Sequence, residues 1–409
     1  MSDRAARTPT TSHEKIDLCR GLFAFLVVAA HAVDVAWAVH PSAPAAMSPA
    51  VRDAWQHVVA AGVFWVIGFF VISGFCIQLS VERQVESGRF PLGNYLAARL
   101  SRILPLYYVA LASAVMFEWL MGAHRPGVWP NGLDPRTLVA QLFVAQNFRQ
   151  TFGSFAPSWS ITNEMFYYVF FGLLTRVAMR RGVRPASLGM VACATLAVGL
   201  EVAYFAWFRR DPLARGLGLL FGLGTIWFQG ALVAVHRDAL RASLVARRVA
   251  AAWPLALATA IGLWYAQAVH LQVLYLVLGV AFTMMLARFV ATDVPDAPAT
   301  PDRGRLGAAI RALGLASYPT YLFHGPLIMW LASAMARTGR LPGDWRATWL
   351  ILSAAGIGSG IVLGFVAERP LMAWRAGLLR RLKASGRPAA EPTAALGATG
   401  GPPVCGMPR

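Results

Sequence analysis

The sequence predicts an all-α integral membrane protein, a polytopic helical bundle of about ten transmembrane helices with both termini in the cytoplasm. Two observations carry this prediction. Of 409 residues, 57% are hydrophobic and 14% are charged, whereas a soluble domain has roughly 25% charged residues because its surface faces water. The apolar residues also come in blocks long enough to cross a hydrocarbon layer of about 30 Å. A mean hydropathy of +0.53 agrees with this class.

Ten apolar blocks are the predicted spans. They are residues 18–39, 57–80, 102–122, 159–179, 186–208, 215–236, 250–268, 270–291, 311–336 and 347–367. The segment 137–150 is apolar but too short to span, so we expect it to be re-entrant or interfacial. With the N-terminus inside the cell, most of the 37 Lys and Arg residues fall in cytoplasmic segments, as the positive-inside rule requires.

The chain divides into a membrane domain and two tails. Residues 1–13 are predicted to be a cytoplasmic tail, residues 14–370 the membrane domain, and residues 371–409 a basic and then disordered cytoplasmic tail. The Pro/Ala-rich segment 40–47 faintly resembles a signal-peptidase site. The apolar stretch before it exceeds the usual length of roughly 7–15 residues, so we expect no cleavage there.

Charge and cysteine content exclude two other classes of protein. The net charge is +18, but the Arg residues cluster at the ends of apolar blocks and form no basic stripe with interleaved aromatic residues. A nucleic-acid partner is therefore not expected. The four cysteines are scattered without a CxxC motif, which argues against a disulfide framework and against a metal site. They are Cys19, Cys76, Cys193 and Cys405.

Ionisable side chains within spans are candidate functional groups because their burial in lipid is costly. In the first span, Arg20 and His31 are separated by eleven residue steps, or about 16 Å along a helix. This spacing predicts Arg20 near the cytoplasmic face and His31 at mid-to-outer depth. Asp34 shares a helical face with His31 and is placed to fix its tautomer. The alternative for His31 is a structural role at a helix contact.

Two more spans carry ionisable groups. Arg99 and Arg102 share one helical face at the depth of Arg20, an arrangement that suits a phosphate-rich ligand. The alternative is ordinary positive-inside anchoring. Glu164 follows Trp159 by five residues and lies about 7 Å below the outer surface if Trp159 marks that surface. Such a carboxylate needs a partner, and a purely structural pairing is the alternative.

The last two spans add a histidine and a carboxylate. His324 lies deep in the ninth span between Pro319 and Pro326, which we expect to interrupt the helix and free backbone groups. Glu368 closes the final span beside Arg369, where an interfacial ion pair is expected.

Depth divides the candidate groups into two sets. His31, Glu164 and His324 fall at mid-to-outer depth, and Arg20, Arg99 and Arg102 at the cytoplasmic side. A phosphate-bearing donor is then expected to bind inside and extend its reactive end toward a base deeper in the membrane. Within FFVISGF, Ser73 and Gly74 are explained by close helix packing.

These motifs together resemble the acyltransferase family 3 of polytopic membrane proteins. The resemblance extends from about residue 14 to residue 370. It rests on IDLCRG with the following His31, FFVISGF, RLSRILPLYY, PSWSITNE, SYPTYLFH and AERP, in the family's order. Two details depart from the commonest pattern: Cys19, and Thr-Asn within PSWSITNE where Ser-Val is frequent.

The resemblance implies transfer of an acyl group, usually acetyl from acetyl-CoA, to a hydroxyl of an extracytoplasmic or lipid-linked glycan such as an exopolysaccharide. It implies a bacterial-type inner membrane and no metal. It makes Arg20 and His31 essential, associates Arg99 and Arg102 with the CoA donor, and matches Glu164 to the motif's acidic residue. Other motif residues are expected to support the site. They are Asp17, Asp34, Ser73, Trp159, Ser160, Tyr321 and Glu368.

On this basis His31 is expected to act as a general base on the acceptor hydroxyl or as the acyl carrier. Glu164 is expected to orient His31 or to bind the sugar, and His324 to assist. Rival functions are a glycan or lipid transporter or flippase, a glycan polymerase or ligase, and a structural or receptor protein without chemistry. A transporter predicts broken helices in repeated halves, and no repeat is evident. The acceptor, the acyl chain and the oligomeric state stay open.

Overall fold

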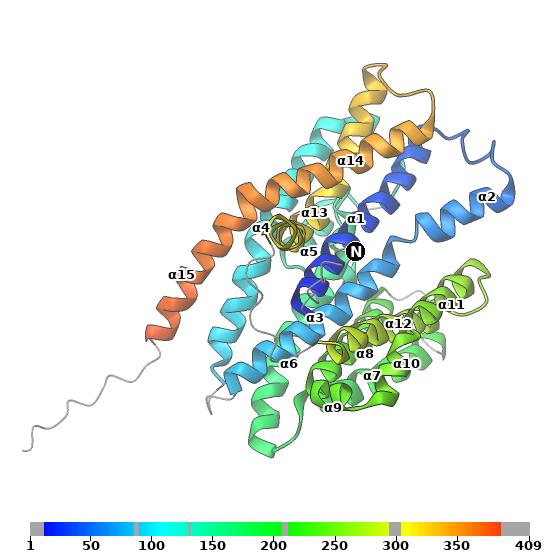
Figure 1. The fold of residues 1–409 in the computed structure, drawn as a ribbon. Helices are drawn as coiled ribbons and strands as arrows, with labels where there is room; N and C mark the ends of the chain where they lie inside the picture. The colour runs from blue at the N-terminus through cyan, green and yellow to red at the C-terminus, as the bar shows by residue number, and fades with distance from the viewer. Residues whose placement is uncertain (1–11, 86–89, 130–131, 207–211, 294–303, 386–409) are drawn as a thin grey trace, which may run out of the picture.

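The computed structural model describes residues 12–85, 90–129, 132–206, 212–293 and 304–385, and these residues form a bundle of helices (Figure 1). Within these ranges, β structure is limited to one isolated bridge between Gly132 and Phe152. The predicted all-α fold is confirmed. In lipid no water is present to bind free backbone groups, and a helix satisfies its N–H and C=O groups within one segment.

Ten helices of the described chain form the body of the bundle. They are α1 (Ser12–Val39), α3 (Gly62–Val85), α4 (Leu92–Met121), α6 (Trp159–Arg181), α7 (Pro185–Ala206), α8 (Pro212–Val235), α11 (Trp253–Tyr265), α12 (Leu271–Ala291), α13 (Gly304–Arg337) and α14 (Trp345–Leu363). Each predicted span overlaps one of them.

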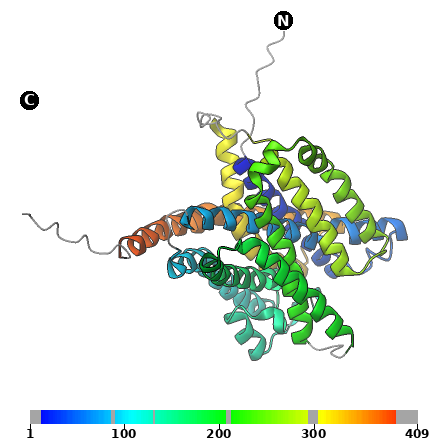
Figure 2. The same ribbon diagram turned by 90° about the horizontal axis from the view of Figure 1, so that it is seen from below.

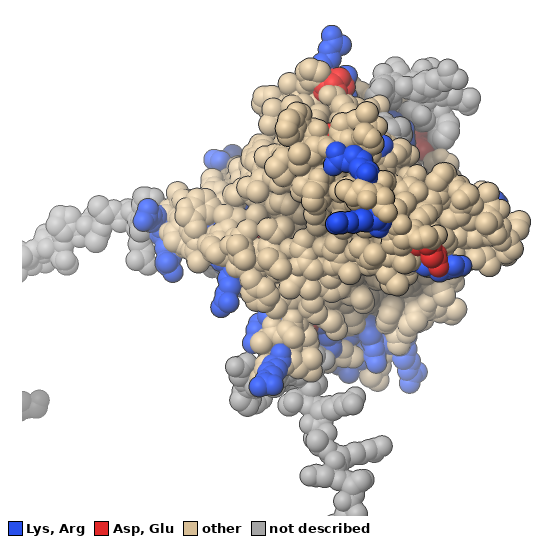
Figure 3. Space-filling view, turned by 90° about the horizontal axis from the view of Figure 1, so that it is seen from above, with Lys and Arg blue, Asp and Glu red and all other residues tan. Residues whose placement is uncertain are grey.

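Eight helical segments of the described chain are long and apolar enough to cross a membrane, judged by length and composition. The predicted spans 159–179 and 311–336 lie on α6 and α13, which are long but are not among these eight. The count of ten spans and the side of the termini therefore stay predictions. Large apolar side chains such as Trp119 are exposed, and neutral residues dominate the face in Figure 3.

Other helical pieces connect or extend these ten helices. They are α2 (Pro49–Ala54), η1 (Trp55–Val59), η2 (Gly122–His124), α5 (Pro135–Leu142), η3 (Gln146–Phe148), η4 (Ala156–Ser158), α9 (Arg237–Ala242), α10 (Leu244–Ala251), η5 (Gly364–Glu368) and α15 (Arg369–Ser385). The π-turn η5 joins α14 to α15 in one continuous rod (Figure 1). This rod continues past residue 367, where the last span is predicted to end. Residues 1–11 and 386–409, which hold most of both predicted tails, lie outside the described residues.

Helices α1 and α13 pack side by side at the centre of the bundle, and α14 covers both. Helix α4 packs on α13, whereas α7 to α12 gather on one side of α3 (Figures 1 and 2). Helix α13 is unbroken from Gly304 to Arg337 although Pro319 and Pro326 lie inside it. The expected interruption at these prolines is therefore wrong, because the packed neighbours hold the helix continuous.

The segment between α4 and α6 folds into the bundle and is fixed by buried polar contacts. The Tyr107 hydroxyl donates to the backbone carbonyl of Gln141 at 2.7 Å, and the side-chain amide of Gln141 donates to Ser158 Oγ at 2.8 Å. Gln146 donates to the Ser158 carbonyl at 2.7 Å. Buried amides need such partners. Helix α5 (Pro135–Leu142), which overlaps the segment 137–150, has eight residues, too few to cross a bilayer.

Asp134 begins α5 and accepts hydrogen bonds from the backbone of Arg136 and Thr137. The Thr137 hydroxyl, which donates to the same carboxylate, is the main cause that lowers the pKa of Asp134 to about 2. The cap is therefore ionised throughout the physiological pH range.

Two glycines allow α3 and α8 to touch backbone to backbone. A Cβ on Gly74 would overlap the carbonyl oxygen of Trp227, and a Cβ on Gly230 would overlap that of Val71. The close packing predicted for Gly74 is thus confirmed.

We expect Gly74→Ala to lower the unfolding temperature of the purified protein, because the added Cβ forces α3 and α8 apart. Thermal unfolding in detergent measures this effect. Gly262→Ala on α11 is the control, since no atom lies within 4 Å of its added Cβ. Equal unfolding temperatures for the two variants would contradict this account of the contact.

Candidate functional site

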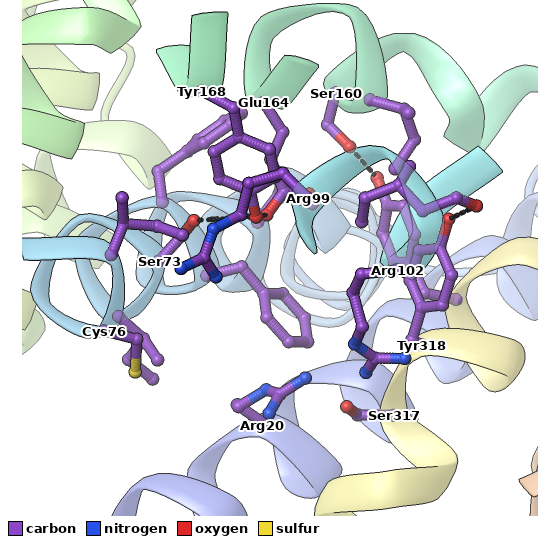
Figure 4. Close-up of a pocket in the computed structure, with 18 of the residues that line it drawn as sticks. Arg20, Ser73, Cys76, Arg99, Arg102, Ser160, Glu164, Tyr168, Ser317 and Tyr318 are labelled. Atoms are coloured by element: carbon purple, nitrogen blue, oxygen red, sulfur yellow. Dashed lines mark hydrogen bonds between the residues drawn. The ribbon is translucent and has the colours of Figure 1, made fainter. Parts of the chain in front are cut away.

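A central cavity of about 280 Å³ lies between α1, α3, α4, α6, α13 and α15 (Figure 4). Along α3 its wall extends from Ile77 to Val66, about 16 Å at the rise of an α-helix. Arginines gather at its Ile77 end, where Arg99 donates to Ser80 Oγ at 2.5 Å. We call this part the arginine end. Four arginines and one carboxylate of the described chain line the cavity. They are Arg20, Arg99, Arg102, Arg375 and Glu164.

The structure brings Arg20, Arg99 and Arg102 together from α1 and α4, as their predicted depths suggested (Figure 4). Arg20 Nη1 lies 3.8 Å from the Asp17 carboxylate, and both side chains are partly exposed. The guanidinium group of Arg99 lies over the Tyr95 ring at 5.3 Å. Guanidinium groups held in this way present fixed donors to an anion.

Arg102 forms an ion pair with Glu368, whose side chain is completely buried. The face of the Tyr318 ring supports the same guanidinium group at 5.3 Å, a favourable cation–π distance. The expected interfacial pairing of Glu368 is wrong, because η5 directs the carboxylate into the bundle toward α4. A buried carboxylate requires such a partner.

Glu164 faces the cavity rather than the candidate base. Its carboxylate accepts hydrogen bonds from Ser73 Oγ at 3.1 Å and from the Tyr168 hydroxyl, and Trp227 Nε1 donates to the same Ser73 oxygen. Among the described contacts none joins Glu164 to His31, so the expected orienting role is wrong. The two residues share a predicted depth but lie on different parts of the bundle.

His31 and His324 form a hydrogen-bonded pair, which we call the His pair. His31 Nδ1 lies 2.8 Å from His324 Nε2, and the rings are nearly parallel, with an interplanar angle of 11°. His324 Nδ1 lies 3.0 Å from the Thr320 carbonyl oxygen. His324 is completely buried and His31 is partly exposed. The sequence predicts both histidines as site residues but does not predict their contact.

The Thr320 carbonyl fixes the tautomers of the neutral pair. A carbonyl only accepts, so the proton of His324 lies on Nδ1 and its Nε2 accepts from His31 Nδ1. Among the described residues no group forms a hydrogen bond with His31 Nε2, so its lone pair is left free. It faces Gly62, whose absent Cβ would lie 3.6 Å from this nitrogen.

Two expected supporting residues lie apart from the His pair. Within the described chain, no hydrogen bond or ion pair joins Asp34 to His31. The hydrogen-bond partner of His31 is His324 instead of Asp34. Trp159 packs on Phe70 at 6.3 Å inside the bundle rather than marking an outer surface.

The His pair lies next to one end of the cavity. Gly62, which contacts His31, is one turn beyond Val66, the last lining residue of α3. On α13, Tyr321 lines the cavity and its ring lies 6.1 Å from that of His324. Ser160 donates to Tyr321 at 2.7 Å. The cavity thus leads from the arginine end toward the His pair.

The structure adds lining residues that the sequence reasoning missed. Tyr168 follows Glu164 by four residues and Tyr318 precedes the predicted Tyr321 by three, so helical spacing alone could have found both. Arg375 lies on α15, in the segment predicted to be a tail, and donates to the Ala98 carbonyl at 2.8 and 3.0 Å. Its signal is the basic helical pattern that follows Pro370.

No set of three or more His, Cys, Asp or Glu side chains in the described ranges is arranged to hold a metal ion. A family model described as an acyltransferase domain matches residues 13–369. No curated protein and no solved structure matches the chain significantly.

We expect Glu368→Ala to lower the free energy of unfolding by roughly 3–5 kcal/mol, because it leaves the Arg102 charge buried without its partner. Denaturant titration in mixed micelles measures the change. Asp238→Ala is the control, because the Asp238–Arg241 pair is exposed and such pairs contribute about 1 kcal/mol or less. A Glu368→Ala effect no larger than that of the control would contradict the assignment.

Proposed function

The chain belongs to the acyltransferase family 3 and is a multi-pass membrane acyltransferase, and from this premise we propose its two substrates and its catalytic base. The donor is acyl-CoA, with acetyl-CoA the first expectation. The acceptor is a hydroxyl of an extracytoplasmic or lipid-linked glycan, and the membrane is the bacterial inner membrane. The observation that carries the proposal is a cationic cavity that leads to a histidine with a free ring nitrogen.

The arginine end suits the phosphate groups of the donor. Three guanidinium groups from two helices converge there, those of Arg20, Arg99 and Arg102. Planar guanidinium groups bind phosphate oxygens with two parallel hydrogen bonds. Glu164 is the single carboxylate among the described lining residues, so the cavity keeps a net positive charge. CoA is made in the cytosol, and the arginine end would face that side.

His31 would supply the base. Its Nε2 accepts the proton of the acceptor hydroxyl as the oxygen attacks the acyl carbonyl carbon. The new C–O bond forms, the C–S bond breaks, and the CoA thiolate receives a proton from the imidazolium. His324 holds the tautomer and stays neutral. Glu164, at the cavity wall, would contact the donor or the sugar.

An acyl-carrier role for His31 would use the same lone pair, with the acyl group resting on Nε2 before it passes to the glycan. Protein labelled by radioactive acetyl-CoA without acceptor would identify that route. Transport of a glycan or lipid, the other function class, does not require a base with a free ring nitrogen beside a cationic cavity.

We expect His31→Ala to lose roughly 10²–10⁴ of the transfer rate, the usual contribution of a positioned general base. The assay follows labelled acetyl-CoA into glycan in membrane vesicles supplied with a native glycan extract. His40→Ala is the matched control, since His40 forms a hydrogen bond with Thr348 outside the site. Full activity in folded His31→Ala, or no transfer by wild type from any common acyl-CoA, would refute the proposal.

His324→Phe should also reduce transfer, because a phenyl ring accepts no proton from His31 Nδ1 and the tautomer is released. His324→Gln should retain more activity, since an amide oxygen can accept that hydrogen bond. Turnover at saturating donor measures both variants. Equal turnover of the two variants would show that the hydrogen bond to His31 is not what His324 contributes.

A further inference from the structure

Aromatic rings line the end of the central cavity that faces the His pair. Phe69 and Tyr321 line this end, with ring centroids 6.0 Å apart. Phe23 packs against Phe69 from behind at 5.8 Å. Tyr321 in turn contacts His324. We call Phe23, Phe69 and Tyr321 the aromatic wall, and within it Tyr321 is the ring that contacts the His pair.

Neighbouring helices hold Phe23 in place. Gly68 on α3 leaves the room for the ring, since a Cβ there would lie 2.5 Å from it. Phe282 on α12 packs edge to face against the same ring at 5.3 Å. Phe23 is 3% exposed, so Phe69 rests on a support that has no space to yield.

Hydrogen bonds hold Tyr321 as well. Its hydroxyl donates to the Pro157 carbonyl at 2.7 Å and accepts from Ser160. Its backbone belongs to α13, where a Cβ on Gly325 would lie 2.6 Å from the Ser154 carbonyl oxygen. The tyrosine is thus fixed between α13 and the segment that precedes α6.

The cavity is also small. Its volume of about 280 Å³ is just below the usual range of small-molecule sites, roughly 300–1,000 Å³. A donor whose phosphates occupy the arginine end would place its thioester near Phe69, with little space beyond it. A rigid apolar end of this kind discriminates by about tenfold or more for each methylene that does not fit.

Resting on the proposed function, we propose that Phe69 is the specificity-determining residue that limits the transferred group to a short acyl chain. Phe69 forms the part of the aromatic wall that the chain beyond the thioester meets first. Removal of its ring would extend the cavity toward Phe23 and admit a longer chain.

The test measures binding alone, with CoA thioethers that bear ethyl, butyl or hexyl groups and transfer nothing. Each competes with labelled acetyl-CoA for the purified protein in equilibrium dialysis. We expect wild type to bind the hexyl thioether at least about tenfold more weakly than the ethyl one. Phe69→Ala should reduce this ratio to below about threefold, and the milder Phe69→Leu should give an intermediate ratio.

Phe117→Ala is the matched control, because Phe117 does not line the cavity. Its ring stacks on that of Trp330, with 5.2 Å between the ring centroids. It should keep the wild-type ratio. Similar wild-type affinity for the ethyl and hexyl thioethers would overturn the proposal for Phe69, as would an unchanged ratio in Phe69→Leu. Failure of wild type to bind any thioether or acetyl-CoA would instead refute the proposed donor, and the inference with it.

Discussion

The close contact between α1 and α13 sets the geometry of the whole site. Gly314 on α13 makes it possible, because a Cβ there would lie 2.7 Å from Asp17 on α1. At this separation the Asp17–Arg20 pair borders the cavity near one end of the contact, and His31 meets His324 near the other. Because both helices are continuous, a slip of one along the other would break the histidine hydrogen bond and move the arginine together.

Charge inside the bundle is arranged by pairing rather than by exclusion. Glu368 is fully buried against Arg102, whereas Glu164 is held by neutral hydroxyl groups. Glu368 thereby forms a structural ion pair with Arg102, whereas Glu164 is held in position by hydrogen bonds and neutralises no arginine. An anion that enters would replace solvent around guanidinium groups already held by ion pairs, ring faces and carbonyls, which reduces the entropy lost on binding.

Relations within one helix were predictable because 3.6 residues per turn fix them. The depth of Arg20 relative to His31 and the shared face of Arg99 and Arg102 follow from spacing. Contacts between residues on different helices do not follow from spacing, because the depth of a residue does not determine which helices are neighbours. The His31–His324 contact joins residues separated by 293 positions. Glu164 is predicted at the depth of His31, yet its partners come from α3 and its own helix. Eight of the ten predicted helical blocks were readable from apolar length, whereas the more polar α6 and α13 rely on buried partners that only the folded bundle supplies.

The aromatic wall has a consequence for the energy balance of the cell. A continuous chain of water molecules through a membrane provides a route for protons, whose flow dissipates the transmembrane potential, worth about 2.3 kcal/mol per charge at 100 mV. The rings of Phe23, Phe69 and Tyr321 pack against one another at the end of the cavity nearest the His pair. Packed rings at this end would narrow the space open to water, so that an acyl group could be handed on by exchange of covalent bonds while the bilayer stays electrically insulated.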